Sequence, residues 1–135
     1  MALHVLVYSD DITVRRKVIE GIGTRPDSAL PPLEFIEVAT GPMVIERLTV
    51  SGSQHRIDLA ILDGEATPFG GMGVAKQVKD EVDAPPPIVV LTGRPQDSWL
   101  ASWSRAEGVV PRPIDPMRLT ATVIELLGSA AATHR

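Results

Sequence analysis

Short apolar runs rich in β-branched residues alternate along this chain with segments of helical period. The runs that read as strands cover residues 3–8, 33–39, 57–62, 88–91 and 108–110. The segments that read as helices cover residues 11–21, 41–50, 74–82, 96–106 and 116–127. Strict alternation favours a parallel sheet, because each parallel connection needs a crossover. We therefore predict an α/β fold with a doubly wound, five-stranded parallel sheet in the order 2-1-3-4-5.

Three segments fall outside this alternation. Residues 24–32 are rich in proline and read as a loop, and the sequence leaves open whether that loop binds a partner or only connects. Residues 64–73 hold four glycines and Pro68, so we expect irregular structure there. Residues 129–135 are small and polar, which predicts a flexible tail after a domain spanning residues 1–128.

Composition removes several classes of function. The 135 residues leave room for one domain, and a formal charge of -4 without a basic face argues against a nucleic-acid groove. No leader and no membrane-length apolar run is visible, so we expect a cytoplasmic protein with no membrane contact. Without cysteine there is no thiolate chemistry, and the three histidines are scattered. No Gly-x-Ser-x-Gly elbow supports a hydrolase.

Polar residues follow four of the predicted strands. Residues 9–11 (Ser-Asp-Asp) follow the first strand, Asp63 the third, Thr92 the fourth and Arg112 the fifth. In a doubly wound sheet these carboxyl ends meet at one edge, where ligands bind. Carboxylate oxygens suit a hard cation such as Mg²⁺. A carboxylate nucleophile beside a hydroxyl and a fixed cation is typical of phosphoryl transfer.

At these positions the chain resembles the CheY-like receiver domain of bacterial two-component response regulators, over roughly residues 3 to 127. The matching segments are residues 5–11, 58–63, 88–93 and 112–116. The resemblance implies the flavodoxin-like (βα)5 fold. It also implies a phosphorelay signalling protein rather than an enzyme, here a stand-alone and atypical receiver.

The resemblance assigns roles to individual residues. The aspartate matching Asp63 accepts a phosphoryl group from a histidine kinase, and Thr92 and Arg112 match the residues that bind the phosphoryl oxygens. Glu65 matches a position that tunes dephosphorylation, with an exposed loop charge as the alternative.

The same resemblance implies Mg²⁺ as the cofactor. Its ligands would be Asp10, Asp63 and the backbone carbonyl of Glu65, with Asp11 as a substitute ligand. Each aspartate also has an ordinary explanation. Asp63 can cap a loop, and Asp10 or Asp11 can cap the helix that follows.

The chain departs from the family pattern at several positions. Ser9 takes the first position of the acidic pair, and Arg112 replaces a lysine and could pair directly with Asp63. Val109 stands where the family has an aromatic switch residue, and Pro68 comes one residue late. The Arg112–Pro113 bond matches a usually cis position, so we predict a cis peptide there.

Three hypotheses follow. The first is a phosphorylated response regulator acting on a kinase or another signalling protein through the face of residues 96–106, 108–110 and 116–127. Trp99 and Trp103 lie on that face one helical turn apart, and a homodimer is a further option. The second is a phosphorylation-independent pseudo-receiver in which Arg112 pairs Asp63. The third is a nucleotide or small-anion sensor in the same cleft.

Overall fold

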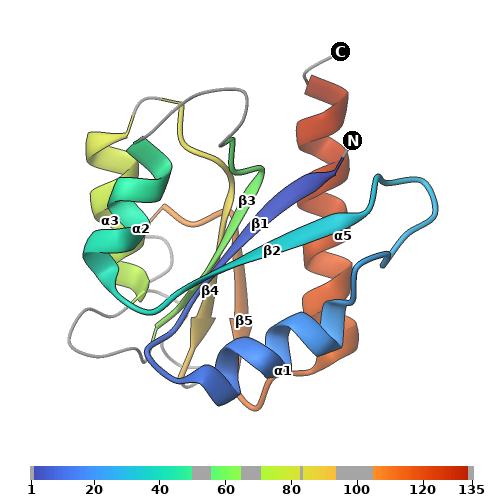
Figure 1. The fold of residues 1–135 in the computed structure, drawn as a ribbon, viewed down its shortest axis with the longest axis horizontal. Helices are drawn as coiled ribbons and strands as arrows, with labels where there is room; N and C mark the ends of the chain where they lie inside the picture. Colours follow the sequence, from blue (N-terminus) through green and yellow to red (C-terminus); the bar gives the residue numbers. More distant parts are fainter. Residues whose placement is uncertain (1, 50–55, 65–70, 83, 94–104, 134–135) are drawn as a thin grey trace.

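The computed structural model describes residues 2–49, 56–64, 71–82, 84–93 and 105–133. Its strands are β1 (Leu3–Tyr8), β2 (Leu33–Val38), β3 (Leu59–Asp63), β4 (Ile88–Thr92) and β5 (Gly108–Pro111). Its helices are α1 (Ile12–Ile22), α2 (Gly41–Thr49), α3 (Gly71–Glu81) and α5 (Pro116–Thr133). All neighbouring strands pair in parallel, in the order β2-β1-β3-β4-β5, which confirms the predicted sheet (Figure 1).

Helices cover both faces of this sheet. In Figure 1, α2 and α3 lie together on one side, and α1 and α5 lie on the other. Because successive side chains of a strand point to opposite faces, β1 divides its residues between two cores. Val5 and Val7 pack toward α1 and α5, whereas Leu6 and Tyr8 pack toward α2 and α3. All residues of β3 and β4 are buried, as the central strands of such a sheet require.

Several element boundaries differ from the sequence prediction. The predicted loop over residues 64–73 is too long, because α3 already begins at Gly71. The last helix does not end at residue 127 but continues to Thr133, through alanines with high helix propensity. Strand β3 starts two residues later than predicted and includes Asp63. Most of the helix predicted over residues 96–106 lies outside the described residues, but Arg105 has a φ of 62° and is not helical.

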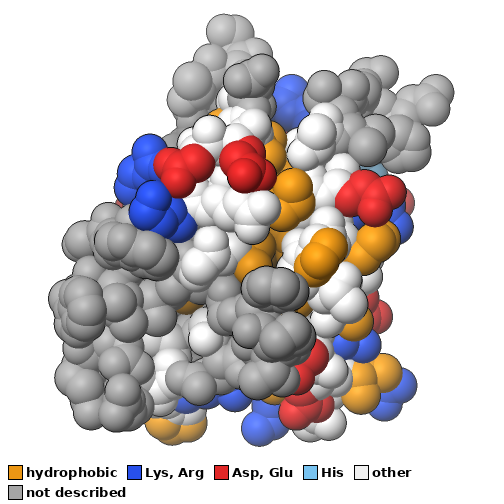
Figure 2. Space-filling model, turned by 90° about the vertical axis from the view of Figure 1, so that its left-hand side faces the viewer, with side chains coloured by type: hydrophobic (Ala, Val, Ile, Leu, Met, Phe, Trp, Pro, Cys, Tyr) orange, Lys and Arg blue, Asp and Glu red, His pale blue; other side chains and the backbone are white. Residues whose placement is uncertain are grey.

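Figure 2 shows the side of the molecule that carries α2 and α3. Acidic and basic side chains lie beside one another at its margins, and hydrophobic side chains gather between them. Met43 on α2 is one of the few large hydrophobic residues described as exposed. Among the described helices, none is both long enough and apolar enough to cross a membrane.

Candidate functional site

Three buried polar residues mark the carboxyl end of the sheet. Ser9, Asp63 and Thr92 are at most 2% exposed, and they are the only buried polar residues in the described part of the chain. Ser9 directly follows β1, while Asp63 and Thr92 end the adjacent strands β3 and β4. The register pairs Tyr8 with Leu62 and Asp63 with Leu91, so the three residues lie at one edge as predicted.

Both carboxylate oxygens of Asp63 have partners. The Ser9 hydroxyl donates a hydrogen bond of 2.8 Å to Oδ2. The Arg112 guanidinium, from the end of β5, forms an ion pair and a hydrogen bond with Oδ1. The pairing of Arg112 with Asp63 therefore occurs as the sequence suggested. A buried carboxylate needs such partners, because an unpaired charge away from water is strongly destabilising.

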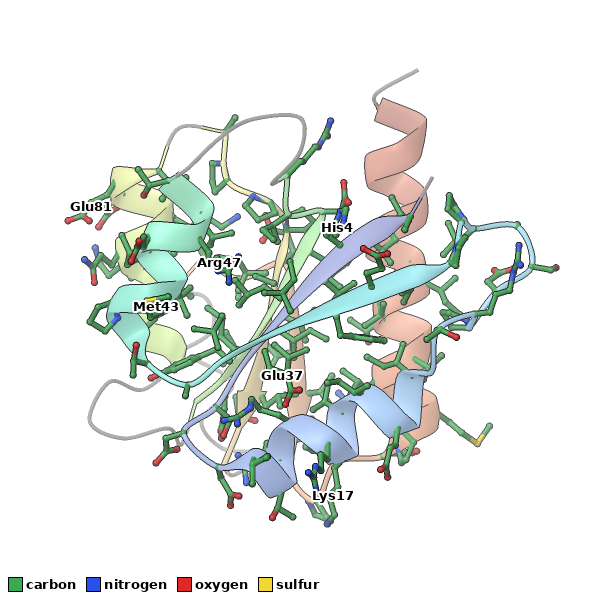
Figure 3. All side chains as sticks on the ribbon, in the orientation of Figure 1. His4, Lys17, Glu37, Met43, Arg47 and Glu81 are labelled. Carbon is green, nitrogen blue, oxygen red and sulfur yellow. The ribbon has the colours of Figure 1, made fainter. Side chains whose placement is uncertain are left out.

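The position of Ser9 is set by contacts on its other side. Its Oγ accepts a hydrogen bond of 3.0 Å from the Asp11 backbone N–H. Its backbone carbonyl accepts one of 2.7 Å from the Arg15 guanidinium, which also donates to Glu37 at 3.1 Å. Figure 3 shows Glu37 between β2 and α1. Sequence reasoning missed the Arg15–Glu37 pair, because nothing local relates a residue of α1 to one 22 positions later.

Two polar atoms at this edge have no hydrogen-bond partner among the described residues. They are Thr92 Oγ1 and Arg112 Nε, and both atoms are buried. The backbones of these residues are linked, since the Arg112 N–H donates to the Thr92 carbonyl at 2.9 Å. The Arg112–Pro113 peptide is cis, as predicted. A buried polar group without a partner calls for an explanation, and a ligand oxygen would provide one.

Gly64 holds the end of β3 close to β4. Its N–H donates to the Leu91 carbonyl at 2.8 Å. A Cβ atom at position 64 would lie 2.6 Å from that same backbone oxygen, so only glycine fits without movement. This close approach keeps Asp63 beside Thr92.

Tyr8 is a further residue of the site that sequence reasoning missed. It is buried at the end of β1, directly before Ser9. Burial raises the pKa of its hydroxyl, and the negative charges of Asp10 and Asp63 raise that pKa further. The hydroxyl of Tyr8 therefore stays protonated beside the acids of the site.

The described acids do not form a ready Mg²⁺ site. Asp11 accepts a hydrogen bond of 2.8 Å from the Thr13 N–H and caps α1, so its side chain serves the helix. Asp63 is engaged by Ser9 and Arg112, and Asp10 is exposed. Within the described ranges, no three histidine, aspartate or glutamate side chains lie close enough together to hold a metal. The donor set thus does not fit a divalent-cation site that exists before a ligand arrives.

A cleft of about 390 Å³ adjoins Arg112 on the α1 side. It is lined by Asp11, Thr13, Val14, Lys17, Arg112, Pro113, Ile114 and Pro116. Asp63 is not part of its lining, so this cleft lies next to the acidic edge rather than over it. The labelled Lys17 extends from α1 into solvent in Figure 3.

Glu65, Pro68, Trp99 and Trp103 lie outside the described residues. Val109, which the resemblance matches to an aromatic switch residue, is half-buried in β5 beside the fully buried Val110.

No protein-family model matches the chain. Two response regulatory proteins of Mycobacterium tuberculosis, from strains CDC 1551 and H37Rv, are each 58% identical to it over 130 residues. Each alignment covers 96% of this chain and 95% of the relative.

Solved structures of low sequence identity share the fold. The receiver domain of AraT, a response regulator from Geobacillus stearothermophilus, superposes with a TM-score of 0.77 at 19% identity, covering 100% of both chains. The signal receiver domain of a LuxO-type repressor protein from Vibrio parahaemolyticus gives 0.78 at 21% identity, covering 99% of this chain and 96% of that one. A CheY-like receiver domain protein from Methanospirillum hungatei gives 0.73 at 15% identity, covering 98% and 99%.

Proposed function

Because this chain belongs to the response regulator receiver family, we propose that it accepts a phosphoryl group on Asp63 and signals through contacts with other proteins. Receiver domains are signalling proteins of phosphorelays. The observation that supports the acceptor role is the buried Asp63 carboxylate, which faces a guanidinium on Oδ1 and a hydroxyl on Oδ2.

In phosphoryl transfer to Asp63, only one of its two carboxylate oxygens acts as the nucleophile. In the proposed step, Asp63 Oδ1 attacks the phosphorus of a phosphohistidine or an acyl phosphate. The new Oδ1–P bond forms as the bond from phosphorus to the donor breaks, and the donor leaves with the electron pair. Meanwhile the Ser9 hydroxyl holds Oδ2 and fixes the rotation of the carboxylate.

Arg112 and Thr92 are suited to receive the phosphoryl group. Arg112 has an additional donor, the buried Nε, beyond the one that contacts Asp63. The Thr92 hydroxyl is buried at the end of the neighbouring strand without a described partner. Phosphoryl oxygens are strong acceptors, and fixed donors aimed at developing charge are the main means of catalysing phosphoryl transfer.

Mg²⁺ is the expected cofactor of the family. Receiver domains in general bind it at their acidic site, and Asp10 and Asp63 are the carboxylates of this chain that correspond to its predicted ligands. When bound, it would neutralise charge on the transferring group. Within the described ranges, no three histidine, aspartate or glutamate side chains form a metal site. Phosphorylation of this chain is therefore to be measured both with Mg²⁺ and with a chelator.

Partners are assigned through the family. Response regulator receivers interact with histidine kinases and other proteins. For this chain the proposed contact is the face that the sequence assigns to residues 96–106, 108–110 and 116–127. The alternative, a phosphorylation-independent module, rests on the Arg112–Asp63 pair. That pair does not favour the alternative, since a cation beside an unphosphorylated acceptor carboxylate suits both functions.

The direct test is intact-mass analysis after incubation with acetyl phosphate. We expect one phosphoryl adduct on the unaltered protein and none on Asp63→Asn. The matched control is Asp115→Asn, because Asp115 is exposed and accepts from the Met117 N–H, a role that asparagine keeps. An adduct on Asp63→Asn, or no adduct on any protein under conditions that label another receiver, would overturn the proposed function.

A further inference from the structure

Ser9 and Arg112 contact both carboxylate oxygens of Asp63. The Ser9 proton is committed to Asp63 Oδ2, and its oxygen accepts from the Asp11 N–H. We propose that these two residues take the place of the divalent cation at Asp63, so that phosphoryl transfer to Asp63 does not require Mg²⁺. The inference rests on the proposed function, namely that Asp63 is the acceptor.

The charges at the sheet edge support this substitution. The first position of the acidic pair is the neutral Ser9, so the edge has one carboxylate fewer with which to attract a divalent ion. Asp63 already has a cation, because the Arg112 guanidinium contacts Oδ1. Arg15 adds a second guanidinium behind Ser9, balanced by Glu37. Mg²⁺ is usually bound by one or two carboxylates together with phosphates. Of the two acids near Tyr8, Asp10 and Asp63, the second already pairs with Arg112 and Ser9.

Arg112 can supply, in place of a divalent cation, the positive charge that phosphoryl transfer needs. Arginine remains charged at any physiological pH, and its planar fork binds two oxygens at once. As Oδ1 forms its bond to phosphorus, the guanidinium can pass its hydrogen bonds to the phosphoryl oxygens, with Nε as a further donor. With acetyl phosphate, the bond between phosphorus and the acetate oxygen breaks, and acetate leaves with the electron pair. The reaction of Asp63 with acetyl phosphate therefore needs no metal, oxidant or further reactant.

Ser9 has a different task, which is positioning. Its hydrogen bond to Oδ2 keeps that oxygen away from the incoming phosphorus and leaves Oδ1 as the nucleophile. Arg15 supports this orientation by holding the Ser9 carbonyl at 2.7 Å. Restoring a carboxylate at position 9 would replace this hydrogen bond by repulsion and recreate the need for a divalent ion.

The test follows the rate of adduct formation from acetyl phosphate by intact mass, once in Mg²⁺ and once in a chelator. We expect equal rates for the unaltered protein and for Asp115→Asn. Arg112→Met should lower the rate by about 10²-fold or more in both solutions, as loss of one donor to a developing oxyanion does. Ser9→Asp should react only in Mg²⁺.

Each outcome separates the inference from the function on which it rests. An adduct that forms on the unaltered protein only in Mg²⁺ overturns the inference and leaves Asp63 as the acceptor. No adduct in either solution overturns the proposed function and the inference with it. A Mg²⁺ titration followed by thermal unfolding supplies a readout independent of the reaction. We expect no shift of Tm for the unaltered protein, and a rise in its Tm with Mg²⁺ would count against the inference.

Discussion

Asp63 shows how single residues decide the chemistry of this sheet edge. Its carboxylate is 2% exposed and is stabilised by one cation and one hydroxyl. Thr92 is as deeply buried, yet its hydroxyl has no described partner, which costs about 1–3 kcal/mol. A ligand oxygen accepting from this hydroxyl would remove that cost. Ser9, at the position matched by the resemblance to an acid, adds no charge to the site.

Tyr8 gives a prediction at the residue scale, because its folded-state pKa lies above the ordinary value of 10.0. Between the unfolded and folded pKa values, the folded protein retains a proton that the unfolded chain releases. The stabilisation is therefore complete below about pH 10 and is lost as pH rises through the folded pKa. Urea unfolding at neutral and alkaline pH should show that Tyr8→Phe gains stability relative to the unaltered protein on the alkaline side.

The chain has one tyrosine, so its own titration can be followed as well. Tyrosinate absorbance should develop at a higher pH in the folded protein than in urea. Parallel pH profiles of unfolding for the two proteins, or an unshifted titration, would contradict the expectation.

Helix α1 is the element that links the sheet to the site. The Asp11 side chain caps its first turn, the Asp11 N–H donates to Ser9, and Arg15 reaches the Ser9 carbonyl and Glu37. The N-cap residue and a residue of the first turn of α1 thus contact Ser9, which orients Asp63. A shift of α1 along its axis would move Ser9 and alter the hydrogen bond to Oδ2.

The capping role of Asp11 makes a prediction at the scale of the helix. Asp11→Ala should lower the free energy of unfolding by about 1 kcal/mol, because the Thr13 N–H loses its acceptor. Asp11→Asn should cost little, since an amide oxygen caps equally well. Urea unfolding of the three proteins measures both values. Equal losses for the two variants would show that the charge of Asp11 matters more than its cap.

At the scale of the whole molecule, the sheet joins two hydrophobic layers. Residues of one strand serve both layers, as Val7 and Tyr8 do in β1. Loss of packing on one face therefore loosens the strands on which the other face depends. We expect the domain to unfold as one cooperative unit.

Substitutions on opposite faces test this cooperativity. Leu119 of α5 and Val78 of α3 are fully buried in different layers. Leu119→Ala should cost about 2–5 kcal/mol, and Val78→Ala should also destabilise the domain. Each variant should unfold in a single transition at lower stability, and far-ultraviolet circular dichroism and fluorescence should report the same transition. Glu125→Ala, on an exposed position of α5, should change stability by less than about 0.5 kcal/mol. Two separate transitions would contradict the expectation.

The sequence by itself determined the strand order, most element positions and the residues at the sheet edge. Hydrophobic period is a local property, and parallel connectivity leaves few arrangements of five strands, so Asp63 and Thr92 could be placed from the pattern. The early start of α3 escaped prediction because Gly71 and Gly73 are weak helix formers on local grounds.

Only the tertiary structure decided which donors reach Asp63. The Ser9 and Arg112 contacts span 54 and 49 residues of the chain. The structure also decided that Arg15 supports Ser9. These facts depend on side-chain direction across neighbouring elements, which no local period encodes. The physical reason is that a hydrogen bond requires donor and acceptor to agree within fractions of an ångström, and only the packed fold sets distances that finely.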